Sequence, residues 1–243
     1  MVAGLAWGAR VRMDAPKQDD GTLAESSQRA ATPIAGSIAG ILFAVLFGAC
    51  VLIIRFSIND LATSPQTWVQ NGAPKLRFAV ALVPFAGLFF LWFIAVARER
   101  LGRHEDQFFA TVFLGSGLLF IAMMFAAAAS AGAIVAAIGK ASSAGFATST
   151  TYVFARRFIA QIFNVYALRM AAVFLISQAT LWLRTGVMPR WMAFVTYAVA
   201  VLLLFVVTQA YWVILVFPAW VFLVSSYILV TRLRRSAPGR RDV

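Results

Sequence analysis

The sequence is poor in the residues that most enzymes use for catalysis and metal binding. It has one cysteine, Cys50, and one histidine, His104. A single cysteine cannot form a disulfide within the chain, so cysteine content does not indicate the compartment. A single histidine cannot supply both axial ligands of a bis-histidine haem, and it cannot build a histidine-rich metal site. The sequence therefore predicts no metal centre and no cofactor.

Acidic residues are also scarce, and none occurs between Asp106 and Asp242. An aspartyl intramembrane protease and a carboxylate proton relay are excluded, because both need acids inside apolar segments. The stretch LGSGL around Ser116 has the small residues of a serine nucleophile loop. However, His104 would lie about 18 Å away along one helix, too far to hydrogen-bond to the serine. We therefore expect no enzymatic activity.

Apolar residues, in contrast, are abundant. The chain is 62% hydrophobic and 12% charged, with a mean hydropathy of +0.84. Soluble domains carry about 25% charged residues, and a helix that spans a membrane needs about 20 apolar residues. These values predict an all-α, polytopic membrane protein with one transmembrane domain, residues 33–235. We expect a cytoplasmic polar tail at residues 1–32 and a short basic tail at residues 236–243.

The apolar runs predict about six transmembrane helices. They lie at residues 34–56, 78–97, 107–139 and 162–183, with two more inside 191–231 that divide near residues 208–210. The third run would be about 50 Å long as one helix, against a hydrocarbon core of about 30 Å. We expect it to tilt, to project beyond the bilayer or to break, and the Ala- and Gly-rich stretch 126–139 is the expected place for a break.

The net charge of +12 comes from basic residues that flank the apolar runs, which is typical of a bilayer protein rather than a nucleic-acid-binding protein. The N-terminal tail and the segments 98–106, 184–190 and 232–241 together carry 14 Lys and Arg residues. The segments on the other side carry six, with Arg169 set aside. Because cytoplasmic loops are enriched in basic residues, both termini are predicted to be cytoplasmic.

Small residues recur every fourth position in the first apolar run. Gly36, Gly40, Ala44 and Gly48 therefore form one ridge along a helix, the glycine ridge. Helices in lipid associate through close backbone approach along such ridges. The pattern indicates helix–helix contact, either within the chain or with another membrane protein.

The fourth apolar run carries polar residues. At 100° per residue, with Arg157 at zero, Gln161 falls at about 40°, Asn164 at about −20° and Gln178 at about −60°. These four residues are predicted to form a polar stripe, which either bonds helices together or lines a path for a solute. Arg169 falls off the stripe, at about 120°.

Arg169 lies within the membrane-length segment 162–183 and has no acid nearby in the sequence. Three roles are open to it. Its long side chain can reach lipid phosphate, it can bond to a helix carbonyl, or it can bind a ligand.

The charged segment RLGRHEDQFF also has two interpretations. It can form a docking or metal-binding corner at His104, Glu105 and Asp106, or these residues can begin the third helix. We favour the second, because acids stabilise the positive end of a helix.

The stretch ALVPFAGLFFLWFIAVARERLGRHEDQFFATVFLGSGLLF covers the second and third spans and the loop between them. It resembles a family of uncharacterised bacterial multi-pass (six-helix) integral membrane proteins. The resemblance implies a location in the bacterial plasma (inner) membrane, and it implies no site residues.

Two functions remain open. The first is a non-enzymatic plasma-membrane protein that acts as an assembly, packing or interaction partner of other membrane components. Its partners would be the lipid bilayer and a membrane protein or a second copy of the chain. The second is a small transporter or channel subunit for a polar or anionic solute that uses the polar stripe.

Overall fold

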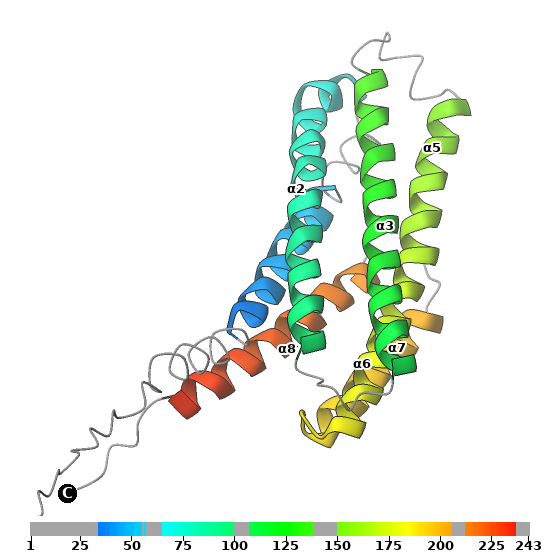
Figure 1. Ribbon diagram of the computed structural model, residues 1–243. Helices are drawn as coiled ribbons and strands as arrows, with labels where there is room; N and C mark the ends of the chain where they lie inside the picture. The colour runs from blue at the N-terminus through cyan, green and yellow to red at the C-terminus, as the bar shows by residue number, and fades with distance from the viewer. Residues whose placement is uncertain are drawn as a thin grey trace, which may run out of the picture.

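The computed structural model describes residues 34–54, 56, 65–99, 107–138, 150–205 and 212–236. This part of the chain is helical except for residues 186–189, which join two helices, and it contains no strand. The predicted tail of residues 1–32 and the segment 101–106 lie outside the described residues. The first helix is Ile34–Ile54. It is followed by α2 (Pro65–Glu99), α3 (Gln107–Ile138), α5 (Thr150–Gln161), the π-helix η1 (Ile162–Ala167), α6 (Leu168–Thr185), α7 (Arg190–Phe205) and α8 (Trp212–Ser236) (Figure 1).

Five of the described helical stretches are long and apolar enough to cross a membrane: Ile34–Ile54, Gly72–Glu99, Gln107–Ala137, Val153–Thr185 and Val213–Arg234. The helix α7 is apolar but has only 16 residues. The all-α class is therefore confirmed for the described residues, and the number of membrane-length helices supports a multi-pass membrane protein. The apolar run 191–231 divides into α7 and α8, and the predicted point of division falls in residues 206–211, outside the described part.

Of the three alternatives for the third span, tilting, projection and a break, the break does not occur within the described helix, because α3 continues through all of its 32 residues. Alanine is the strongest helix former, and it dominates this half of the helix. The hydroxyl of Ser130 donates to the carbonyl of Ala126 at 2.8 Å, so it does not interrupt the helix. The helix α2 is also longer than predicted, since it begins at Pro65 rather than near residue 78.

The helix ends fall into two groups (Figure 1). The beginnings of the first helix, α3 and α7 and the ends of α2, α6 and α8 lie toward the lower end in this view. At the upper end, α2, α3 and α5 stand side by side and reach beyond the other helices. The first helix and α8 cross these three obliquely. This grouping matches the two sides on which the sequence distributes its basic segments.

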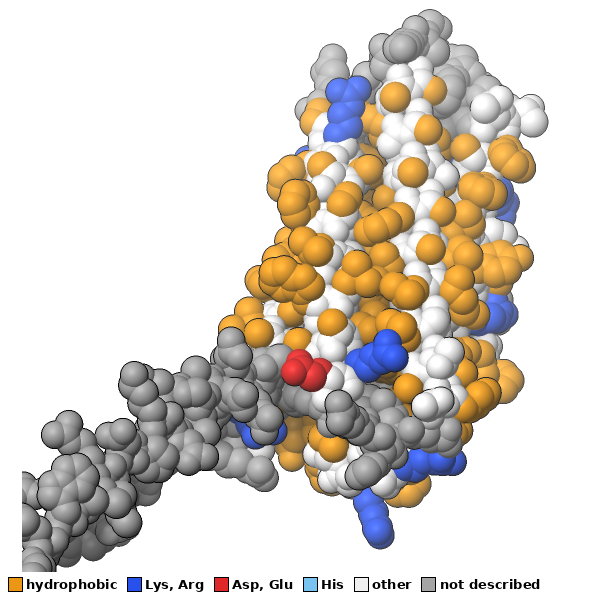
Figure 2. Space-filling view, viewed as in Figure 1, with side chains coloured by type: hydrophobic (Ala, Val, Ile, Leu, Met, Phe, Trp, Pro, Cys, Tyr) orange, Lys and Arg blue, Asp and Glu red, His pale blue; other side chains and the backbone are white. Residues whose placement is uncertain are grey.

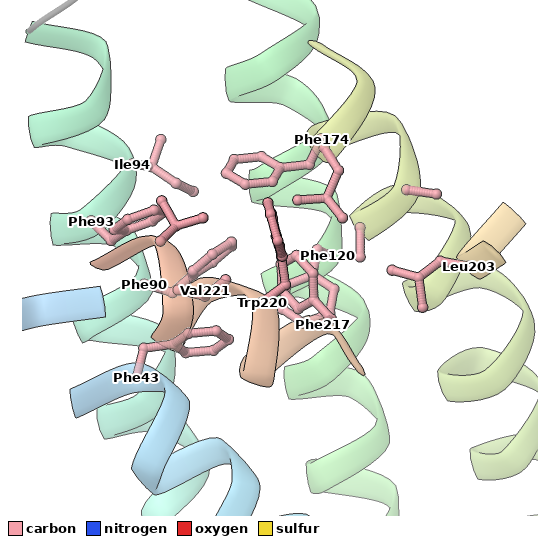
Figure 3. Packing of buried hydrophobic residues seen from close by; sticks show 14 of the residues in the cluster. Phe43, Phe90, Phe93, Ile94, Phe120, Phe174, Leu203, Phe217, Trp220 and Val221 are labelled. Atoms are coloured by element: carbon pink, nitrogen blue, oxygen red, sulfur yellow. The ribbon is translucent and has the colours of Figure 1, made fainter. Parts of the chain in front are cut away.

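Phenylalanine rings fill the middle of the bundle (Figure 3). Phe90 of α2 has its ring centroid 4.5 Å from that of Phe43, 5.4 Å from Phe120 and Phe174, and 5.7 Å from Phe217. These rings come from the first helix, α2, α3, α6 and α8, so one cluster joins five elements. Aromatic pairs at these separations add stabilisation beyond the area that they bury.

Apolar side chains also cover the outer surface of the bundle (Figure 2). Phe85, Leu118, Phe194 and Leu223, from four different helices, are each more than 40% exposed. In a bilayer such side chains contact lipid, so their exposure is the expected arrangement for a membrane protein.

Candidate functional site

The most unusual backbone in the described chain lies between α5 and α6. Together with η1 these helices form one continuous helical column, Thr150–Thr185. In η1 the hydrogen bonds span five residues, and the backbone N–H of Leu168 donates to the carbonyl of Phe163. Single π turns inside α-helices occur frequently at functional sites, so the side chains around η1 are candidates for function.

Arg169 lies directly after η1 and bonds back to it. Its Nη1 donates to the carbonyl oxygen of Val165 at 3.0 Å. Of the three roles expected from the sequence, the structure therefore shows the bond to a helix carbonyl. The side chain is half-buried, and this bond uses one of its five N–H donors.

The π-helix also changes which residues share a face of the column. A π-helical turn takes up about one residue more than an α-helical turn, so one residue must be omitted from the count across η1. Arg169 then moves from about 120° to about 20° from Arg157, and Gln178 moves from about −60° to about −160°. The predicted angular positions of these two residues are wrong, because the count assumed an α-helix throughout.

Burial agrees with the corrected positions. Arg157 and Gln161 are exposed and Asn164 is half-buried, whereas Gln178 is only 5% exposed. The polar stripe is therefore divided between the outer surface and the interior, and Arg169 belongs to its outer part. A role for the stripe in moving a solute stays a prediction.

Gln178 lines a small cavity of about 40 Å³ near the lower end of the bundle. The other lining residues come from the first helix, α2, α6, the α6–α7 turn and α8: Gly36, Ser37, Phe93, Val96, Ala97, Trp182, Val187, Met188 and Ile228. Within the described residues no hydrogen bond to the Gln178 carboxamide is seen. A cavity of this size accommodates water, which could pair with the amide, but it does not accommodate a larger solute.

The glycine ridge of the first helix lies against α2 and α8 at two of its four positions. A Cβ atom at Gly36 would contact the side chain of Val96. One at Gly40 would contact the Ser225 hydroxyl and would lie 2.8 Å from Phe93 Cδ2. Ala44 is buried, whereas a Cβ at Gly48 would have no neighbour within 4 Å. Close approach within the chain thus involves Gly36 and Gly40.

Two buried polar atoms in α8 have no hydrogen-bond partner in the described structure, namely Trp220 Nε1 and Ser225 Oγ. An unpaired buried polar atom lowers stability, so each needs an explanation. The Ser225 hydroxyl occupies the space that Gly40 leaves open, which gives it a packing role. Neither residue was predicted from the sequence, although Ser and Trp stand out within the apolar run 191–231.

One side-chain hydrogen bond between helices joins α6 to α7. Thr180 Oγ1 and the Tyr197 hydroxyl are 2.7 Å apart, and Thr180 Oγ1 is also 2.8 Å from the carbonyl of Ile176. Because threonine has one hydroxyl proton, which it donates to this carbonyl, Tyr197 donates to Thr180. This pair was not predicted from the sequence either.

The remaining chemical candidate, Ser116, is buried and committed to its own helix. Its hydroxyl lies 2.7 Å from the Val112 carbonyl and 3.2 Å from the Phe113 carbonyl. His104, Glu105 and Asp106 lie outside the described residues. No group of three His, Cys, Asp or Glu side chains that could hold a metal occurs in the part of the chain that the structure describes.

No known protein family, curated protein or solved structure matches the chain.

Proposed function

We propose that the chain is a non-enzymatic multi-pass membrane protein that acts as an assembly, packing or interaction partner of other membrane components. The observation that carries this proposal is the filled interior. A transport path needs a polar or water-filled route between helices, and here phenylalanine rings occupy the centre of the bundle. The rings of Phe113 and Phe174, on α3 and α6, are stacked with centroids 4.4 Å apart.

The proposal includes the membrane and the orientation. The helix ends at the lower end of the bundle in Figure 1 carry Arg98, Arg184, Arg190, Arg232 and Arg234. These residues belong to the more basic group of segments. By the positive-inside rule this side is cytoplasmic, so both termini are cytoplasmic. The resemblance to bacterial multi-pass proteins favours the bacterial plasma membrane.

The proposal is tested by isolating the tagged chain from its native membrane in polymer-bounded lipid discs, without detergent. We expect a stoichiometric membrane-protein partner or a second copy of the chain, identified by mass spectrometry. The control is an unrelated multi-pass protein with the same tag and a similar abundance. A chain that elutes as a lipid-bound monomer, and that moves a solute across proteoliposomes, would contradict the proposal.

One observation favours the alternative, a small transporter or channel subunit for a polar or anionic solute. Gln178 is buried, lines a cavity and has no described partner for its carboxamide. On this alternative, Gln178→Leu abolishes solute movement without reducing membrane abundance. Gln107→Leu, at an exposed position at the beginning of α3, serves as the matched control.

A further inference from the structure

Arg169 is a cation on the outer surface of an apolar protein. We propose that Arg169, together with Tyr166 and Gln161, binds the phosphodiester of a phospholipid in the leaflet at the Thr150 end of the column. This inference goes beyond the proposed function, because it concerns the surrounding lipid rather than a protein partner.

The Arg169 side chain points toward the Thr150 end of the column. Arg169 Nη1 bonds to the carbonyl of Val165, which precedes it by one turn. The guanidinium therefore lies nearer to the Thr150 end than its own Cα atom. The side chain has extended toward the nearer membrane surface, as long basic side chains do in spanning helices.

The position of the Arg169 guanidinium along the membrane normal also fits a lipid site. Arg184 lies in the last turn of α6 and marks the opposite membrane surface. The level of Val165, where the guanidinium sits, is about 29 Å from Arg184 along the column. On α2, Arg77 and Arg98 are about 32 Å apart. Both separations are close to a hydrocarbon core of about 30 Å, so with Arg184 at one edge of the core the Arg169 guanidinium lies at the other edge, within reach of lipid phosphates.

Gln161, Tyr166 and Arg169 share the outer face of the column. Tyr166 is 54% exposed and Gln161 is also exposed, whereas Ala167 and Leu168 behind them are buried. Tyr166 and Arg169 are three residues apart and therefore lie about 60° apart around the helix. With one residue omitted for the π turn, Arg169 also comes to within about 20° of Gln161, instead of about 80°. A hydroxyl, a carboxamide and a guanidinium then face the same lipid.

The described chain offers Arg169 little negative charge. Among the described residues Glu99 is the one acid, and it is the last residue of α2, which ends toward the lower end in Figure 1. Val165 uses one of the five N–H donors of Arg169, so the guanidinium keeps a fork of donors for a phosphate. The bilayer supplies such an anion at this depth.

The test counts the phospholipid molecules that the purified full chain retains, by native mass spectrometry in mild detergent with added phosphatidylglycerol. We expect Arg169→Met to bind this lipid about tenfold or more weakly, because it loses charged hydrogen bonds. The lipid affinity of Arg169→Lys should lie between those of the wild type and Arg169→Met, since lysine keeps the charge but lacks the planar fork. The matched control, Arg157→Met, should bind as the wild type does, because Arg157 lies about 12 Å farther along the column than Val165.

Two further arms identify the source of the phosphate. A diacylglycerol glycolipid without phosphate should not replace phosphatidylglycerol, and excess inorganic phosphate should not displace it. Displacement by inorganic phosphate, or unchanged retention in Arg169→Met, would overturn the proposal. If Arg169→Met does not fold, Tyr166→Phe at the exposed face provides the same measurement, and unchanged retention in that variant would also count against the site.

Discussion

Gly40 and Gly48 lie on one helix, eight residues apart, but they have different surroundings. A side chain at Gly40 would collide with Ser225 and Phe93, whereas a side chain at Gly48 would meet open space. Packed positions tolerate added atoms poorly, at a cost of about 1–3 kcal/mol. Gly36 and Gly40, at the beginning of the first helix, are therefore the glycines of the ridge that close packing requires.

We predict that Gly40→Leu lowers the melting temperature of the protein in detergent and that Gly48→Leu leaves it nearly unchanged. The leucine at position 40 must push the first helix away from α2 and α8. Differential scanning fluorimetry of the two purified variants measures the difference. Equal effects would mean that the first helix does not pack as described.

A second prediction concerns the hydrogen bond between Thr180 and Tyr197. Tyr197→Phe should destabilise the protein by about 0.6 kcal/mol, the average for such bonds between membrane helices. Thr180→Val combined with Tyr197→Phe should cost less than the sum of the two single changes, because both remove the same bond. Thr196→Val is the control, since the Thr196 hydroxyl donates to Met192 in its own helix. Additive costs would contradict the bond.

Single residues show where the sequence was informative and where it was not. Spacing identified Gly36 and Gly40, because one residue in four is a property of the helix alone. The unpaired hydroxyl of Ser225 was not predictable, because it depends on which helix faces Gly40. Arg169 was recognised as unusual, and a bond to a helix carbonyl was among its expected roles, but the π turn that precedes it was not predicted.

At the level of elements, the column formed by α5, η1 and α6 is the main departure from expectation. Apolar length predicted a helix here, and the helix is present. The π turn could not be predicted, because an extra residue is absorbed only when both flanking helices are held by tertiary packing. Here α3 contacts α5, η1 and α6. The error in placing Arg169 and Gln178 follows from that one residue.

The third prediction compares two single-residue deletions in the column. Deleting Asn164 from η1 should be tolerated, because the segment can close to an α-helix while both flanks keep their faces toward α3. Deleting Val173 from α6 should not be tolerated, because it rotates everything before it by about 100°. Size-exclusion profiles and melting temperatures in detergent measure the outcome. Equal damage from the two deletions would count against the π turn as an absorbed extra residue.

For the whole molecule, the proposed membrane position puts Arg77 and Arg98 on α2, and Arg169 and Arg184 on the column, at the two faces of a layer about 30 Å thick. The upper parts of α2, α3 and α5 then project beyond it, as their reach past the other helices indicates (Figure 1). The sequence predicted that the third helix was too long for the bilayer. It did not predict that α2 and α5 extend with it, because their extensions are less apolar and carry Lys75, Arg77, Arg156 and Arg157.

The fourth prediction concerns orientation. Cysteines introduced at Ser64 and Ser143 should react with an impermeant thiol reagent in intact cells, because both loops belong to the less basic side. A cysteine at Ser236 should react only after the membrane is opened. Labelling is measured by a gel shift in a Cys50→Ser background. The reverse pattern would place the termini outside.

The native Cys50 can report the separation of two helices. It is 1% exposed, and its Sγ lies 3.4 Å from the carbonyl of Ala79, so the thiol is enclosed where the first helix meets α2. A membrane-permeant maleimide can reach this sulfur only when the two helices separate. The rate of thiol modification in the unaltered chain therefore reports how often the bundle opens, without any introduced probe.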